Sequence, residues 1–155
     1  AAVRRRAVLA YEVASQQASV DTQRIAVMGF CFGGMCALEC ARSGVDVKAV
    51  ITAHGVLAQS DLATEPMSAS FLVLHGYQDP QVPPECLSAF ADEMNAAGVN
   101  DWVFTFFGTA KHSFTDPKTG SFDAAKEIEM GREYHKIAAE RSFDYAVELL
   151  HEKLV

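Results

Sequence analysis

Apolar residues recur along the chain with two different periods, and these periods predict two kinds of element. From Val3 to Ala18 the apolar positions are three and four residues apart, which is typical of one face of a helix. Four later runs are short and almost wholly apolar, as expected for strands buried on both faces of a sheet. The predicted strands are residues 25–30, 47–53, 71–75 and 102–107.

Segments of helical character lie between or after these runs. Residues 35–43 have a helical composition, and residues 83–97 begin with two prolines and end before a glycine. Apolar residues also recur at steps of four, three and four from Phe143 to Leu154. Because strands joined by helical crossovers form parallel sheets, the pattern predicts an α/β fold with a mostly parallel sheet of about four strands and flanking helices.

Composition narrows the classes of partner. The 155 residues suit a single domain spanning 1–155, and the formal net charge of −7 repels nucleic acid and anionic membrane surfaces at long range. No apolar run approaches the roughly 20 residues that a membrane-spanning helix requires. The four cysteines do not form a dense disulfide framework, and no signal peptide precedes them. We therefore expect a cytoplasmic protein with reduced thiols that binds neither nucleic acid nor membrane.

The first predicted strand leads into a candidate nucleophile. Residues 29–33 read G-x-C-x-G, the spacing of a nucleophile elbow with Cys31 in place of serine. A helix amino terminus lowers the pKa of a thiol, and the N–H of Phe32 is the natural first donor to an oxyanion. The alternative is that Cys31 is a small buried residue in a glycine-rich turn. A dinucleotide loop fits worse because it needs glycine at position 31.

Two further residues favour the catalytic alternative. Asp79 and His112 follow later predicted strands, and nucleophile, acid and histidine occur in this chain order in α/β-hydrolases. In such a triad the histidine accepts the thiol proton, while the acid orients the imidazole. Three agreements of residue type, order and position predict that Cys31, Asp79 and His112 meet at one edge of the sheet.

Other polar and aromatic residues are weaker candidates. His54, Tyr77 and Phe114 lie close to the predicted strand ends and are candidates for contact with substrate, although residues at such places often only pack or bond to backbone. Cys36 and Cys40 have a spacing that could ligate a metal, but no second pair completes a tetrahedral set. We therefore expect these two cysteines to pack in the core, and we expect no metal site.

With these motifs in place, the chain resembles the dienelactone hydrolase family of the α/β-hydrolase superfamily. The resemblance covers nearly the whole chain and rests on residues 24–34, on 72–76 with Asp79 and Val82-Pro83, and on 111–114. It implies a hydrolase that needs no metal or organic cofactor and cleaves a small ester or lactone through an acyl-cysteine. The implied roles are Cys31 as nucleophile, Asp79 as acid, His112 as base and Phe32 as oxyanion donor.

The chain is shorter than members of that family, which begin several strands earlier. We therefore expect the carboxyl-terminal portion of the fold, without its amino-terminal strands. Strand 25–30 then becomes an apolar edge, which a missing amino-terminal segment or a second copy in a homo-oligomer would cover. The alternative function is a catalytically incomplete remnant that binds a ligand or a partner.

Overall fold

A computed structural model describes residues 1–59, 62–121 and 123–155. Within these residues four parallel strands form one sheet in the order β1-β2-β3-β4, so that neighbours in sequence are neighbours in space. The strands are β1 (Ala26–Phe30), β2 (Ala49–Ala53), β3 (Ser70–Gly76) and β4 (Trp102–Phe107). The predicted α/β fold with a four-stranded parallel sheet is confirmed.

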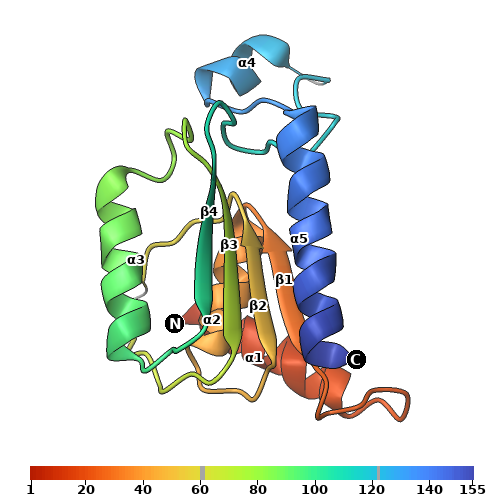
Figure 1. The fold of residues 1–155 in the computed structure, drawn as a ribbon. Helices are drawn as coiled ribbons and strands as arrows, with labels where there is room; N and C mark the ends of the chain where they lie inside the picture. The colour runs from red at the N-terminus through yellow and green to blue at the C-terminus, as the bar shows by residue number, and fades with distance from the viewer. Residues whose placement is uncertain (60–61, 122) are drawn as a thin grey trace.

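Helices cover both faces of this sheet (Figure 1). The helices are α1 (Ala2–Ser15), α2 (Phe32–Ala41), α3 (Pro84–Ala96), α4 (Ala124–Glu129) and α5 (Lys136–Leu154). One hydrophobic cluster joins α1, α2 and α3 to one face of the sheet, and a second cluster joins α5 to the opposite face. Both faces of β2 and β3 are therefore covered, and every residue of these two strands is buried.

Alternate residues of the central strands divide between the two clusters. Val50 and Phe71 belong to the cluster under α2 and α3, whereas Ile51 and Leu72 belong to the cluster under α5. Successive side chains of a strand point to opposite faces, so a run that is apolar throughout supplies both cores. Among the described residues, no helix is both long enough and apolar enough to cross a membrane.

Helix α5 buries its small residues and exposes some of its large ones. Its buried residues are Ala138, Ala139, Ser142 and Ala146. Phe143 and Val147 remain 46% and 64% exposed, although the apolar spacing places them on a common face. The ring of Phe143 lies 6.1 Å from that of Phe30 at the end of β1, which is itself partly exposed. Apolar side chains are therefore open to solvent along the β1 edge, and a segment that covers this edge stays a prediction.

A buried ion-pair cluster, which we call the Arg42 cluster, links the helices on the other face. It consists of Arg42, Glu39, Glu93 and Arg4. The Arg42 guanidinium bonds both oxygens of Glu93 on α3 at 2.8 and 2.7 Å and Glu39 on α2 at 3.0 Å. Arg4 on α1 bonds the second oxygen of Glu39 at 2.9 Å. Two cations and two carboxylates thus join α1, α2 and α3 without a net charge.

Candidate active site

One polar residue follows each strand at the carboxyl edge of the sheet. Cys31 follows β1, His54 follows β2, Asp79 comes three residues after β3, and His112 comes five residues after β4. The carboxyl ends of parallel strands share one edge, where open α/β sheets bind their ligands. This is the arrangement that the sequence predicts for Cys31, Asp79 and His112.

Cys31 occupies a sharp turn between β1 and α2. Its backbone has φ 49° and ψ −120°, a conformation that L residues rarely adopt. Strained dihedrals at a strand-to-helix turn are the signature of a nucleophile elbow. A Cβ on Gly29 would lie 2.0 Å from the carbonyl oxygen of Gly33, so position 29 accepts only glycine. The first glycine of the motif is therefore needed for the turn.

The second close backbone approach involves Gly34 and not Gly33. The elbow spacing predicts that residue 33 must be small, but a Cβ there would meet no atom within 4 Å among the described residues. A Cβ on Gly34 would lie 2.3 Å from the Thr52 hydroxyl and 2.8 Å from the Cα of Gly55. The steric requirement within this structure thus lies one residue later than the motif suggests, where α2 passes the end of β2.

His112 and Asp79 form a buried pair. The Nδ1 of His112 lies 2.8 Å from Oδ2 of Asp79, and both residues are at most 5% exposed. The other carboxylate oxygen of Asp79 accepts the backbone N–H of Gln81 at 2.8 Å. With Nδ1 held by Asp79, the Nε2 of His112 is the atom that is free to act on Cys31.

His54 lies against Cys31, a contact that the motifs did not reveal. Its Nδ1 is 3.2 Å from Cys31 Sγ and also 3.2 Å from the Cys31 backbone N. Its Nε2 is 2.8 Å from Oγ1 of Thr115, a residue that sequence reasoning missed. In one tautomer of His54, Nδ1 accepts the Cys31 N–H; in the other, Nδ1 donates its own N–H to the Cys31 sulfur and the Cys31 N–H keeps the carbonyl of Ala53. A ring nitrogen from each of His54 and His112 and the Cys31 sulfur lie within 4.8 Å of one another, so these three residues could also hold a metal ion.

Ser113 is a further residue of the site that sequence reasoning missed. Its hydroxyl lies 3.4 Å from Cys31 Sγ. Among the described residues, only Cys31, His54 and Ser113 combine a side chain with a positive φ, and the side chains of His54 and Ser113 both contact the Cys31 sulfur. Local backbone strain of this kind collects at functional sites. The only sequence signal for Ser113 was its place directly after His112.

The contacts around Cys31 favour a thiolate. Burial raises the pKa of the thiol, but hydrogen bonding with His112, His54 and Ser113 outweighs burial and lowers the pKa from 9.0 to about 5. Burial likewise favours the neutral form of His112, but interactions with Asp79 and Cys31 outweigh it and raise the imidazole pKa from 6.5 to about 9. Between these values, thiolate and imidazolium coexist as an ion pair.

The remaining residues that the sequence singled out differ in how far they are buried. Phe32 is the first residue of α2, so its N–H has no acceptor within the helix and is available beside Cys31. Phe114 is completely buried, with its ring 5.0 Å from that of His54 in an edge-to-face contact. Tyr77 is 69% exposed and packs on Phe106. Contact of His54, Tyr77 or Phe114 with substrate stays a prediction.

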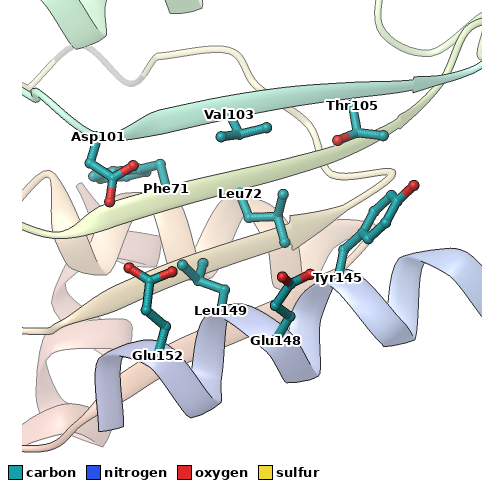
Figure 2. A pocket seen from close by; sticks show the side chains of 9 residues that line it. All are labelled: Phe71, Leu72, Asp101, Val103, Thr105, Tyr145, Glu148, Leu149 and Glu152. Atoms are coloured by element: carbon teal, nitrogen blue, oxygen red, sulfur yellow. The ribbon is translucent and has the colours of Figure 1, made fainter.

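A groove of about 340 Å³ lies away from this cluster, between α5 and the strands β3 and β4 (Figure 2). Apolar side chains such as Leu72, Val103 and Leu149 line it together with the carboxylates of Glu148 and Glu152. Its lining includes none of the four polar residues that follow the strands, which are Cys31, His54, Asp79 and His112. The groove is therefore separate from the chemistry at the carboxyl edge of the sheet.

Comparisons with known proteins find a matching family and several similar proteins. A sequence model of the dienelactone hydrolase family matches residues 1–154. An uncharacterized protein from Caenorhabditis elegans is 38% identical over 136 residues, which are 86% of this chain and 82% of that protein. Two solved structures each cover 99% of this chain, namely a dienelactone hydrolase-like promiscuous phosphotriesterase from metagenomic libraries (35% identity, TM-score 0.84) and m3DLH (37%, 0.86). The chain spans 62% of the length of each of these two proteins.

Proposed function

The chain belongs to the dienelactone hydrolase family, and from this premise we propose that it hydrolyses a small carboxylic ester or lactone through a Cys-Asp-His triad. The observation that carries the proposal is the buried His112–Asp79 bond of 2.8 Å beside a cysteine at a strained elbow. A buried acid that fixes one imidazole nitrogen and leaves the other facing a nucleophile is the arrangement of hydrolase triads.

In the first step, the Cys31 thiolate attacks the carbonyl carbon of the substrate. The electron pair of the carbonyl moves to oxygen, and the N–H of Phe32 donates a hydrogen bond to this oxyanion. As the tetrahedral intermediate collapses, the ester C–O bond breaks and His112 gives its Nε2 proton to the departing alkoxide. The products of this step are an alcohol and an acyl-cysteine, or a single opened chain when the substrate is a lactone.

In the second step, water hydrolyses the acyl-cysteine. His112, now neutral, takes a proton from water as the hydroxide adds to the acyl carbon, and the C–S bond then breaks to restore the thiolate. Asp79 keeps the imidazole in one tautomer and stabilises its cationic form in both steps. Because this chain spans 62% of the two solved relatives, we propose this activity for the protein that contains these residues.

The test is hydrolysis of p-nitrophenyl acetate with the acyl intermediate followed by intact mass. The parent protein is expected to turn over and to gain one acetyl group in the steady state, whereas Cys31→Ala is expected to do neither. Cys86→Ala is the matched control because Cys86 lies on α3, outside the site. Equal turnover by the parent and Cys31→Ala would refute the proposal.

A protein that binds a ligand without catalysis is the second candidate. Exposed apolar residues at the β1 edge favour it, because a site beside an open edge lacks cover from solvent on that side. No turnover by the parent, together with protection of Cys31 from alkylation by an ester, would support this candidate. A phosphotriester belongs in the substrate panel because one solved relative is described as a promiscuous phosphotriesterase.

A further inference from the structure

The contacts around Cys31 resemble a metal-binding arrangement as closely as a catalytic one. The thiol sulfur and one nitrogen from each of two imidazoles come within 4.8 Å of one another, and His54 Nδ1 is already 3.2 Å from Sγ. Zinc binds thiolate sulfur at about 2.3 Å and imidazole nitrogen at about 2.0–2.1 Å in a tetrahedron, which separates the two donors by roughly 3.5 Å. Binding of the ion would draw the three donor atoms, now within 4.8 Å of one another, closer together.

Both imidazoles are already oriented for ligation. The outer nitrogen of His112 is held by Asp79 at 2.8 Å, and the outer nitrogen of His54 is held by Thr115 at 2.8 Å. Histidines that bind metals normally donate their second N–H in this way, which directs the other lone pair at the ion. The Thr115 hydroxyl and the Asp79 carboxylate therefore each orient one of the two imidazoles.

The role of His54 Nδ1 strengthens this interpretation. Nδ1 lies 3.2 Å from Cys31 Sγ and from the Cys31 backbone N, so in its unprotonated form it directs a lone pair at the space beside the thiolate. Two facing lone pairs need a proton or a cation between them. The Cys31 N–H keeps a second acceptor, the carbonyl of Ala53 at 3.2 Å, when Nδ1 turns to a metal.

We propose that Cys31, His54 and His112 form a three-ligand site for Zn²⁺ that reversibly blocks the nucleophile. The ion binds Sγ and one nitrogen of each imidazole, and water from the open side of Cys31 takes the fourth position. The proton that His112 carries toward the thiolate is released to solvent, and no electron is transferred. Zinc acts here as an inhibitor and not as a cofactor. The inhibition rests on the proposed hydrolase function, but the binding of the ion does not.

Cobalt is the probe for the site because it reports both ligand type and geometry. Titration of the purified protein with Co²⁺ is expected to give a sulfur-to-cobalt charge-transfer band and the intense d–d bands of a four-coordinate ion. Zn²⁺ should displace one equivalent and abolish both signals. Prior alkylation of Cys31 with iodoacetamide should remove the charge-transfer band. A parent protein without this band, or with only six-coordinate cobalt, would overturn the proposal.

The zinc affinity of substituted proteins shows whether the ion has three protein ligands or two. His54→Gln is expected to weaken zinc at least tenfold in the competition titration, and Thr115→Val about tenfold, because loss of an outer partner costs roughly 10–100-fold in metal affinity. His151→Gln, which removes an exposed imidazole at the end of α5, should bind zinc as the parent does. Unchanged affinity in both His54→Gln and Thr115→Val would show that only Cys31 and His112 bind and would overturn the three-ligand site. Thr115→Val retains every ligand, so it tests the site even if His54→Gln fails to fold.

Ester hydrolysis measured beside the titration distinguishes the two proposals. If the parent binds one zinc ion but never hydrolyses an ester, the metal site stands and the hydrolase function fails. If the parent hydrolyses p-nitrophenyl acetate and neither binds Zn²⁺ nor is inhibited by it, the hydrolase stands and the metal site fails. Recovery of activity on addition of a chelator is the result expected when both are correct.

Discussion

Two buried polar clusters flank opposite ends of α2, and they use charge in different ways. At the carboxyl end of the helix, all five N–H donors of Arg42 have acceptors, supplied by two carboxylates and by two backbone carbonyls at 3.2 and 3.0 Å. At the amino end, the Cys31 sulfur contacts His54 Nδ1 at 3.2 Å and Ser113 Oγ at 3.4 Å and lies on a strained backbone. The fully buried and fully paired guanidinium stabilises one arrangement of helices, whereas the partly exposed thiol remains accessible to a reagent.

The two clusters differ in what the loss of a charged side chain should change. The Arg42 cluster has balanced charges and joins three helices, so its removal should affect folding. The cluster of Cys31, His54, Asp79 and His112 lies on loops beyond the sheet, so its removal should affect chemistry more than folding.

The largest effect is expected from Cys31→Ala. Loss of the nucleophile should lower ester turnover by about 10⁵-fold or more, since removal of a triad nucleophile costs on the order of 10⁶-fold. Urea unfolding should change by less than about 1 kcal/mol because Cys31 is only partly buried. A variant that loses several kcal/mol in the free energy of unfolding would remove the distinction between the two clusters.

Asp79→Asn is expected to lower turnover by about 10⁴-fold while the thiol remains. An amide can offer its N–H to Nδ1 and so favour the wrong imidazole tautomer, which is the origin of losses of about this size in a serine triad. Asp116→Asn on the loop after His112 is the matched control, because its carboxylate caps only the N–H of Lys118. Equal loss in the two variants would assign Asp79 a role in loop structure.

Arg42→Met should lower the free energy of unfolding by about 3–5 kcal/mol, because Glu93 would remain buried without the guanidinium that binds both of its oxygens, and Glu39 would lose one of its arginine partners. Arg24→Met provides the comparison, since Arg24 pairs with Asp21 while both side chains are about half exposed, and should cost less than about 1 kcal/mol. Urea unfolding measures both. A loss below about 1 kcal/mol in Arg42→Met would contradict the structural role of the Arg42 cluster.

Much of the fold follows from the apolar pattern. Strand 102–107 was predicted with the observed bounds, and the other strands differ by at most two residues at either end. The start of α2 was placed at Met35 instead of Phe32 because two glycines hide the first turn. Helix α4 was missed because its six residues carry little periodicity. Small residues of α5 pack on the sheet together with Leu149 and Leu150, whereas Phe143 and Val147 remain exposed, so the apolar spacing marks the buried face only in part.

The site was predictable in its order and not in its contacts. Chain order and position after successive strands predicted that Cys31, Asp79 and His112 meet, because parallel strands end at one edge. The approach of His54 to the thiol depends on a positive φ that no residue type signals, since His54 has φ 40°. The bond from His54 to Thr115 depends likewise on the path of a loop. Local propensity does not encode such tertiary contacts.

Two neighbouring glycines test how closely α2 must approach the end of β2 near Cys31. Gly34→Ala should cost about 2–3 kcal/mol, because the new methyl would overlap Thr52 and the backbone at Gly55. Gly33→Ala should change stability by less than about 1 kcal/mol, because its methyl meets no described atom and alanine favours a helix. Thermal unfolding of both variants decides the matter. The reverse order would show that another chain segment packs over Gly33.

The smallest expected effect is the change in Cys31 alkylation between pH 6 and pH 8. The lowered pKa of about 5 keeps the thiol ionised above that value, so the rate should vary less than about twofold across this range. An ordinary thiol with a pKa near 8.5 would accelerate by nearly a hundredfold over the same interval. Cys40, on the same helix, should stay unreactive because burial raises its pKa to about 11.

Below pH 5 the rate of Cys31 alkylation should fall as the thiolate gains a proton. Above pH 9 ester turnover should fall while alkylation persists, because His112 then lacks the proton for the leaving group. Peptide mapping after iodoacetamide treatment measures each cysteine separately, and a hundredfold rise at Cys31 between pH 6 and pH 8 would show that the surrounding imidazoles do not stabilise the thiolate.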